Sequence, residues 1–318
     1  MARKRKGQPV HGWIAIDKPE GIGSTKVVSD VRRLFDAAKA GHGGTLDPLA
    51  SGILPIALGE ATKTVAYVMD GAKTYRFTVQ FGEARSTDDR EGEVTATSDV
   101  RPDDTAIRAV LPRFVGEISQ VPPAFSALKI DGERAYDLAR AGETVELAAR
   151  TVRIDRLELI ERTGPDLATF EVACGKGTYV RSLARDIAAC LGTVGHVARL
   201  RRTACGPFNE TNAIPLDKAR SLGHGPALRA LLLPILTALD DIPALALTED
   251  EARRLGSGQV FSLRETPSAF GPTQVVKALC DGRLVALAQV EGGLVRSLRG
   301  LNLETSSSGE DDVDHCRA

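Results

Sequence analysis

The pattern that most constrains the fold of this chain is a strict alternation of apolar and polar residues from Tyr75 to Phe81. A period of two is typical of a strand that buries one face. The alternation recurs at residues 170–174, and a glycine-rich turn then leads into residues 180–191, whose apolar side chains follow helical spacing. Because strands and helices do not alternate regularly enough for a doubly wound sheet, the sequence predicts an α+β fold.

The N-terminal part of the chain predicts a short strand followed by a helix. Residues 12–17 form an apolar run that a lysine and a proline end, and the apolar residues between 27 and 35 have helical spacing. Ser24 and Thr25 stand just before this helix. Hydroxyl side chains are favoured at the position that precedes a helix, so we expect one of the two to cap it.

A change of composition near residue 240 predicts a domain boundary, because residues 223–243 become rich in leucine and alanine with proline breaks. Beyond it, Asp281-Gly282 separates two apolar runs, and this dipeptide favours the two-residue turn of a β-hairpin. We therefore expect a first domain at 12–240 and a small β-rich domain at 243–303, with a basic N-terminal arm at 1–11 and a disordered acidic tail at 304–318.

Composition argues against membrane and exported proteins. Of the 318 residues, 42% are hydrophobic and 26% are charged, as in ordinary globular proteins. No apolar run approaches the ~18 residues of a membrane span, and the basic start lacks the apolar region of a secretory signal. Five cysteines, without a C-x-x-C pair or zinc spacing, fit neither a disulfide framework nor a structural metal site. A cytoplasmic location fits best.

A basic segment lies at residues 175–205, although the whole chain has a net charge of only −1. Such a segment binds a polyanion such as RNA through a local patch, or it is simply a solvated face of the protein. Its basic residues are Lys176, Arg181, Arg185, Arg199, Arg201 and Arg202, and its one acid is Asp186.

Asp47 is the first candidate for chemistry. It lies in a glycine-rich loop, before Pro48, and a residue before proline avoids helical geometry. An isolated Asp-Pro is usually a turn, but here His42 precedes it and a small, apolar segment follows. We expect a carboxylate in these surroundings to be desolvated and to need a cationic partner, for which Arg181 would serve.

These residues also match a known family. The loop reads His42-Gly43-Gly44-Thr45-Leu46-Asp47-Pro48-Leu49-Ala50-Ser51-Gly52 and resembles the catalytic motif of the TruB-type pseudouridine synthases, which modify the T-loop uridine at position 55 of tRNA. Further blocks in the family's order cover about residues 12–208; they include Trp13–Pro19, Lys73-Thr74-Tyr75, Thr87–Gly92, Gln120–Lys129 and Gly177–Asp186. Phe125 stands where many members have tyrosine.

The resemblance implies a pseudouridine synthase domain with a mixed or antiparallel sheet and an RNA-clamping insertion at about 120–150. It implies, more weakly, that residues 243–303 form a PUA-like RNA-binding domain, the alternative being a domain that only stabilises the chain. The implied reaction breaks the glycosidic bond of a flipped uridine, rotates the base and rejoins it through carbon. It needs no redox step and no group donor, so we expect neither a cofactor nor a metal.

The resemblance also implies roles for individual residues. Asp47 is the catalytic carboxylate, either a nucleophile or the base that starts elimination, and Arg181 is its ion-pair partner. The family positions that contact the substrate base or fill its place in the RNA are Tyr75, Tyr179, Leu200 and His42. We expect RNA phosphates at Lys176, Arg199, Arg201 and Arg202.

Two other functions remain open from the sequence. The chain could remodel structured RNA as a binding module without catalysis, or it could be one subunit of a guide-RNA-dependent complex, as related synthases are. The compact chain favours a monomer that acts on the T-arm of tRNA without a protein partner. Asp88-Asp89 could suggest a metal pair or a second acid–base couple, but neighbours on a strand face opposite ways, so we interpret them as structural.

Overall fold

The structure is a computed structural model that describes residues 7–126, 129–130, 133–134, 147–265 and 267–303. The N-terminal residues 1–6, the tail 304–318 and most of the expected RNA-clamping insertion therefore lie outside the described residues. The chain forms two compact units, with the division between Ala238 and Leu239. Among the described residues, no helix is long and apolar enough to cross a membrane.

The first unit is built on one mixed sheet of ten strands, as the expected α+β class requires. The strand order is β14-β1-β3-β12-β4-β11-β10-β7, with β13 paired to β12 and β2 to β3. Two pairings, β1 with β14 and β3 with β12, are parallel, and the others are antiparallel. The strands are β1 (Gly12–Lys18), β2 (Ala40–His42), β3 (Ser51–Leu58), β4 (Lys73–Phe81), β7 (Gly116–Gln120), β10 (Arg150–Thr163), β11 (Leu167–Cys174), β12 (Gly195–Cys205), β13 (Phe208–Asn209) and β14 (Ala213–Pro215).

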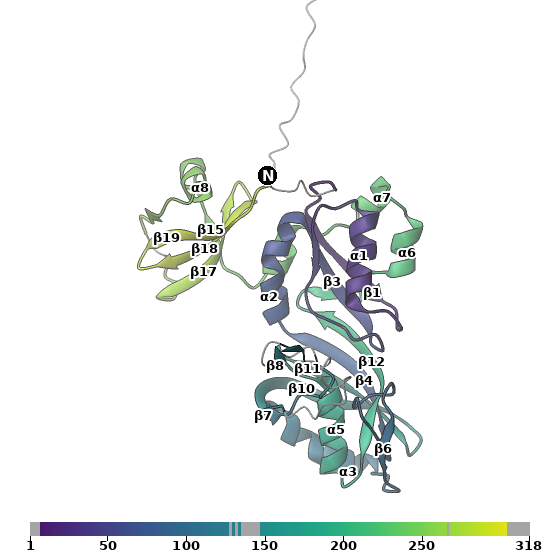
Figure 1. The fold of residues 1–318 in the computed structure, drawn as a ribbon. Helices are drawn as coiled ribbons and strands as arrows, with labels where there is room; N and C mark the ends of the chain where they lie inside the picture. Colours follow the sequence, from purple (N-terminus) through teal and green to yellow (C-terminus); the bar gives the residue numbers. More distant parts are fainter. Residues whose placement is uncertain (1–6, 127–128, 131–132, 135–146, 266, 304–318) are drawn as a thin grey trace, which may run out of the picture. The chain divides into compact units, whose positions relative to one another are not determined.

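Helices gather at both ends of this sheet, as Figure 1 shows. At the β14–β1–β3 end lie α1 (Ser24–Leu34), α6 (Leu216–Ser221) and α7 (Pro226–Arg229), whereas α5 (Val180–Cys190) and α3 (Asp104–Val110) lie against the end that contains β4 and β10. The remaining elements of the unit are α2 (Val65–Asp70), the 3-10 helices η1 (Gly59–Thr64), η2 (Leu111–Phe114) and η3 (Ile235–Leu239, which crosses the division), and the short pairs β5 (Glu83–Arg85) with β6 (Val94–Thr97) and β8 (Lys129–Ile130) with β9 (Glu133–Arg134).

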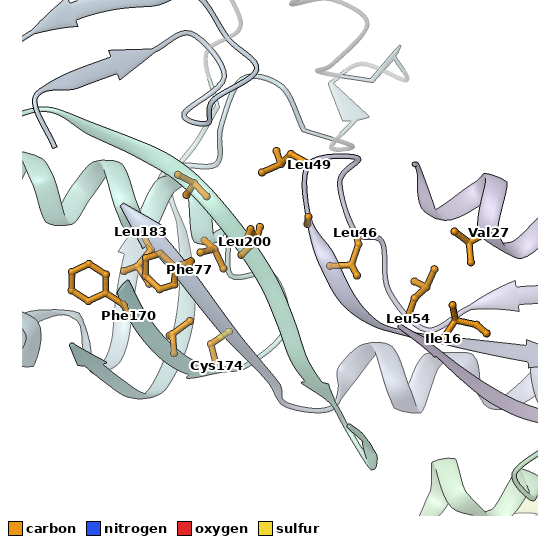
Figure 2. Close-up of a cluster of buried hydrophobic side chains, with 14 of the residues drawn as sticks. Ile16, Val27, Leu46, Leu49, Leu54, Phe77, Phe170, Cys174, Leu183 and Leu200 are labelled. Carbon is orange, nitrogen blue, oxygen red and sulfur yellow. The ribbon is translucent and has the colours of Figure 1, made fainter. Parts of the chain in front are cut away.

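The core of the first unit reaches the loop that carries Asp47. Leu46 and Leu49, on either side of Asp47, are 4% and 2% exposed and belong to the main apolar cluster. In Figure 2, Leu46 lies with Ile16, Val27 and Leu54, while Phe77, Phe170, Leu183 and Leu200 form a separate group. The two leucines anchor the loop, because burying a leucine side chain stabilises by about 1.5–3 kcal/mol.

The expected helix cap at Ser24 is wrong. The N-cap residue of α1 is Gly23, which offers no side-chain cap, and neither Ser24 nor Thr25 caps the helix. The Ser24 hydroxyl instead donates to the Leu46 carbonyl and accepts from the Leu46 amide, both at 2.8 Å. A tertiary contact with the Asp47 loop thus outcompetes the local capping bond, and no short-range pattern could have indicated it.

The second unit contains a five-stranded sheet in the order β15-β17-β18-β19-β16, with α8 packed against it. The predicted hairpin is confirmed, because Asp281 and Gly282 have φ angles of 48° and 74° and join β17 to β18, as a two-residue turn with two left-handed positions requires. The elements are β15 (Ala244–Ala246), α8 (Glu249–Gly256), β16 (Phe261–Ser262), β17 (Thr273–Cys280), β18 (Arg283–Glu291) and β19 (Leu294–Gly300). The same dipeptide, Asp-Gly, also occurs at residues 131–132, which lie outside the described residues.

Candidate active site

The backbone of the Asp47 loop is fixed by hydrogen bonds at six consecutive carbonyls. A loop that left these groups unpaired would be costly to bury, and each carbonyl from Gly43 to Pro48 has a donor from another part of the chain or the loop itself. In chain order the donors are the Cys205 thiol at 3.6 Å, Arg202 at 3.0 Å and again at 3.4 Å, the Ser24 hydroxyl at 2.8 Å, the Ala50 amide at 3.1 Å and the Gly21 amide at 2.8 Å.

Lys18 also binds the Asp47 loop, through its buried ammonium group. Its side chain is completely buried, and the Nζ atom donates to the carbonyls of Pro19, Ile22 and Pro48 at 3.0, 2.7 and 3.4 Å. Burial lowers the pKa of Lys18 to about 8, against an attraction from the Asp47 carboxylate that raises it. Because one ammonium group can bind three carbonyls at once, Lys18 has a structural role in holding this loop.

The predicted ion pair between Asp47 and Arg181 is confirmed. Arg181 Nη2 lies 3.0 Å from Asp47 Oδ2. The same guanidinium also donates to the carbonyls of Thr87 at 3.0 Å and Phe125 at 2.9 Å. Arg181 is the second residue of α5, so the helix, the Asp47 loop and two further segments converge on this one side chain.

The burial of this pair differs from the expectation. Asp47 was expected to be the desolvated partner, but its side chain is 40% exposed, whereas that of Arg181 is only 8% exposed. The apolar neighbours of Asp47 turn into the core and leave the carboxylate at the surface. The pair therefore presents an accessible carboxylate on a buried cation, which is the arrangement that a reacting group needs in order to meet a substrate.

A second carboxylate, Asp89, faces Arg181 from the other side. Its Oδ2 atom lies 3.4 Å from Arg181 Nη1, and its side chain is 3% exposed. The Oδ1 atom accepts from the Thr87 hydroxyl at 2.6 Å and the Glu91 amide at 3.0 Å. Because every oxygen of Asp89 has a partner and the group is buried, it fits a role in holding Arg181 rather than in reacting.

The expectation that Asp88 and Asp89 lie on a strand is wrong. They follow β5 outside any named strand: Asp88 lies in a bend with a φ angle of 58°, and Asp89 forms an isolated bridge with Val197. Asp88 pairs with Arg185 at 2.9 Å while Asp89 pairs with Arg181. Because residues four apart on a helix share a face, the two arginines of α5 can meet two adjacent acids. Burial raises the pKa of Asp88, against the effect of Arg185.

Tyr179 directly precedes α5, the helix that carries Arg181, and Tyr75 lies on β4. Tyr179 is the N-cap residue of α5; its amide donates to Gln120 Oε1 at 2.8 Å, and its hydroxyl is within the electrostatic influence of Arg181 and Asp47. Tyr75 on β4 stands opposite Arg202 on β12, and its hydroxyl is within the electrostatic influence of that guanidinium. Burial raises the pKa of both tyrosines, so both hydroxyls are protonated near neutral pH.

His42 and Leu200 differ in what the structure shows of them. His42 ends β2 next to the Asp47 loop, and its Nδ1 atom accepts from the Gly44 amide at 3.3 Å. Burial, followed by the nearby Arg202 cation, lowers the pKa of His42 and favours the neutral ring. Leu200 is 7% exposed and packs in the core cluster, so its contact with a substrate remains a prediction.

The four residues expected to bind phosphates are not equivalent. Arg199 is exposed and has no ion pair among the described residues, whereas Lys176 pairs with Asp70 at 2.9 Å. Arg201 binds both Asp17 and Glu210, at 2.8 and 2.7 Å. The phosphate contact predicted for Arg202 is wrong, because this side chain is 1% exposed and its guanidinium faces the interior.

Comparison with known proteins decides the family. Residues 32–180 match the model described as TruB family pseudouridylate synthase (N terminal domain), and residues 181–240 match tRNA pseudouridylate synthase B C-terminal domain. The chain is 59% identical over 308 residues to tRNA pseudouridine synthase B of Rhodospirillum rubrum, and this match covers 95% of this chain and 100% of that protein. The chain belongs to the TruB family of pseudouridylate synthases. A second TruB relative, from Gluconacetobacter diazotrophicus, is 55% identical and covers 94% of this chain and 100% of that protein.

Solved structures of TruB-like chains share the fold. A chain of a Cbf5-Nop10-Gar1 complex is 27% identical with a TM-score of 0.69, and covers 92% of this chain and 84% of that one. A chain from an H/ACA RNP bound to a substrate RNA is 24% identical with a TM-score of 0.72, and covers 95% of this chain and 92% of that one. The expected mixed-sheet synthase fold, followed by a β-rich domain, is thus confirmed.

The carbonyl partners of Arg181 could not be predicted from the sequence. Thr87 and Phe125 accept from Arg181 through backbone oxygen atoms, which every residue type carries, so no signal in the sequence distinguishes them. Asp89 lies within a block that resembles the family, and an acid in such a block was a signal that it meets one of the site's cations. The structure brings Asp47 and Arg181 into direct contact, places Tyr179 within their electrostatic influence, and places His42 and Tyr75 within that of Arg202.

Proposed function

We propose that this chain converts a uridine of tRNA to pseudouridine, at position 55 in the T-loop, and that Asp47 is the reacting carboxylate. The observation that carries the proposal is the accessible Asp47 carboxylate, held at 3.0 Å by a buried Arg181. Pseudouridylation needs one such carboxylate, as a nucleophile on the ribose or as the base that starts elimination. Curated relatives at 59% and 55% identity are named tRNA pseudouridine synthase B.

The proposed roles of the other residues follow from their positions. The target base must leave its stack, so the site needs a flat ring on which the flipped uracil can lie, and Tyr75 supplies it. Tyr179 and Leu200 complete the base pocket, and His42 fills the gap that the extruded nucleotide leaves in the RNA. Arg181 positions Asp47 as its buried partner.

The RNA backbone is proposed to cross the exterior of the basic segment. Arg199, Lys176 and Arg201 remain candidates there, in order of how free their charges are. The second unit, with its own apolar core, is proposed to be a PUA-like domain that adds contacts to tRNA outside the T-arm. Comparing affinities for full-length tRNA and for an isolated T-arm hairpin tests this division.

The chain is proposed to act as a cytoplasmic monomer without a protein partner. The chains that share its fold come from an H/ACA RNP and a Cbf5-Nop10-Gar1 complex, but they are only 24% and 27% identical to it, whereas the curated relatives at 50–59% identity are named tRNA pseudouridine synthase B. Those names equally disfavour an RNA-binding module without catalysis.

The test is incubation of the purified chain with an unmodified tRNA transcript, followed by mapping of pseudouridine. We expect one pseudouridine, in the T-loop, without any added protein or guide RNA. A transcript with cytidine at that position is the matched control and should remain unmodified. A transcript that stays unmodified in the T-loop, or is modified only elsewhere, would contradict the proposal.

A further inference from the structure

Arg202 occupies the point where the two halves of the large sheet are joined. β12 pairs with β3 on one side and with β4 on the other, and the β3 pairing has only two registered residue pairs. Arg202 stands opposite Gly52 in β3 and opposite Tyr75 in β4. β3 begins directly after the Asp47 loop, so one residue of β12 is flanked by the loop's strand and by the strand that carries Tyr75.

The side chain of Arg202 binds backbone on one of these sides. Its Nε atom donates to the Ile53 carbonyl at 2.7 Å, and the two Nη atoms donate to the carbonyls of Gly44 at 3.0 Å and Thr45 at 3.4 Å. The Tyr75 side chain lies on the same face of the sheet as Arg202, directly across the β12–β4 pairing. A guanidinium has five donors in a rigid fork, so a single side chain can hold all three carbonyls in one fixed geometry.

This arrangement is unusual for a buried charge. Arg202 is 1% exposed, yet within the described part of the chain no carboxylate forms an ion pair with it. Taking an ion out of water costs several kcal/mol unless other groups compensate, and here carbonyl dipoles are the compensating groups. Such a cation is more than a space-filling residue, because its hydrogen bonds tie down the backbone two and three residues before Asp47.

Two glycines lie next to this contact. A Cβ atom on Gly52 would lie 2.1 Å from the Arg202 carbonyl oxygen, and Gly52 has a φ angle of 103°, which other residues rarely adopt. A Cβ atom on Gly44 would make only an ordinary contact of 3.4 Å with Arg202 Nη1, but the φ angle of 136° at Gly44 is one that other residues rarely adopt. The close approach of Arg202 thus explains Gly52, whereas the backbone conformation explains Gly44.

We propose that Arg202 is a positioning residue, which sets the Asp47 loop and the Tyr75 ring in their places relative to each other. It binds the loop at two carbonyls and lies beside Tyr75 across the β12–β4 pairing, and it contacts neither the RNA backbone nor the reacting atoms. The inference rests on the proposed function and assigns this residue a place within that site.

The test compares Arg202→Lys with Arg220→Lys. Both replace an arginine by a lysine, but Arg220 lies on α6 and binds the buried Asp30 of α1 at 2.7 Å, so it controls for lost stability alone. A lysine ammonium keeps the charge of Arg202 but cannot span its partners. We expect Arg202→Lys to lower the single-turnover rate at saturating T-arm hairpin by on the order of 100-fold, because small misplacement of reacting groups has effects of that size.

Three readouts separate positioning from other roles. Affinity for the hairpin and its salt dependence should stay near the wild-type values in Arg202→Lys, and Arg220→Lys should keep the wild-type rate at temperatures where both variants are folded. Tyr75→Phe removes the hydroxyl on which Arg202 acts from across the strands, with little change of shape. In the double variant with Arg202→Lys, the combined rate loss should be smaller than the product of the single losses, since both disturb one interaction.

Each contrary outcome overturns the inference in a distinct way. A wild-type rate in Arg202→Lys would show that the loop needs no such clamp. A weaker affinity with a flatter salt dependence and an unchanged rate would return Arg202 to the phosphate-binding surface. Fully multiplicative losses in the double variant would remove the coupling to Tyr75, which Tyr75→Phe and Arg202→Gln can test even if Arg202→Lys does not fold. Failure of the wild-type chain to form pseudouridine would instead refute the proposed function.

Discussion

The buried cations around the Asp47 loop fall into two groups, according to whether carboxylates or backbone carbonyls bind them. On α5, Arg181 binds the carboxylates of Asp47 and Asp89. Under the loop, Lys18 and Arg202 bind backbone carbonyls instead. The first group controls the position of a charged side chain, and the second controls the course of the main chain.

A third cation extends the carbonyl-bound group. Lys73 is 7% exposed, and its ammonium donates to the carbonyls of Val68, Met69 and Gly71 at the end of α2. Val68 in turn leaves no room for a side chain at Gly43, where a Cβ atom would lie 2.6 Å from its Cγ1 atom. We therefore expect substitutions of Arg181 and Arg202, which position the reacting groups, to change the rate of the reaction, and substitutions of Lys18 and Lys73 mainly to change stability.

The largest effect that sharpens this comparison is expected at Arg181. Arg181→Lys keeps a positive charge but loses the fork that binds Asp47, Asp89 and two carbonyls at once. We expect turnover to fall by on the order of 100-fold or more, because charged groups aimed at the reacting centre contribute effects of that size. Single-turnover kinetics with a T-arm hairpin, together with equilibrium binding, measure the rate and the affinity separately.

Arg185→Lys is the matched control on the same face of the helix, since Arg185 binds Asp88 and not Asp47. Its turnover should stay much closer to that of the wild type. If the two variants lost turnover equally, or if Arg181→Lys lost affinity in proportion to turnover, Arg181 would not act through Asp47.

Lys18 should reveal the carbonyl-bound group through stability. Burial lowers its pKa from 10.5 to about 8, so between these values the unfolded chain holds the proton more tightly than the folded one. The free energy of unfolding contributed by Lys18 should therefore rise from pH 8 to pH 10.5, by on the order of 1–3 kcal/mol, and stay constant below pH 8.

Urea unfolding of the wild type and of Lys18→Met across this pH range measures the contribution as a difference. Lys26→Met removes an exposed ammonium and controls for the loss of one lysine. A difference between wild type and Lys18→Met that does not change with pH would mean that the Lys18 amine is not desolvated in the folded chain.

The smallest effects are expected on the exterior of the basic segment. Arg199→Gln should weaken RNA binding a few-fold and flatten the log–log salt dependence by roughly 0.7–0.9 for one phosphate contact. Arg201→Gln should change it less, because Arg201 already binds two carboxylates. Titration with the T-arm hairpin at several salt concentrations measures both slopes, and equal slopes in all three proteins would remove this face from the RNA-binding surface.

How much of this the sequence could predict depends on the range of the interaction. The hairpin at Asp281-Gly282 and the strand at 73–81 follow from local patterns, and both are present. The ion pair of Asp47 with Arg181 followed from a recognised motif and a charge. The parallel pairing of β3 with β12 joins segments about 150 residues apart through two residue pairs, and no local pattern specifies it.

The error at Arg202 has a definite physical origin. Arg201 and Arg202 were treated as one basic patch, but neighbours on a strand face opposite sides of the sheet. Arg201 points to the exterior carboxylates, so Arg202 must point to the interior, where its length and donors match the loop carbonyls. Along a strand, only the charged residues that face the same side of the sheet should therefore be counted as one surface patch.

The most direct test of the account is Asp47→Asn, measured for product and for binding in the same hairpin titration. The change removes the carboxylate charge while keeping the shape of the loop, whose six carbonyls are held by other groups. We predict no pseudouridine after single-turnover incubation, with an affinity within about threefold of the wild type, since phosphate contacts and stacking supply most of the binding energy. Measurable pseudouridine from a sequence-verified Asp47→Asn chain would contradict the assignment of Asp47 as the reacting group.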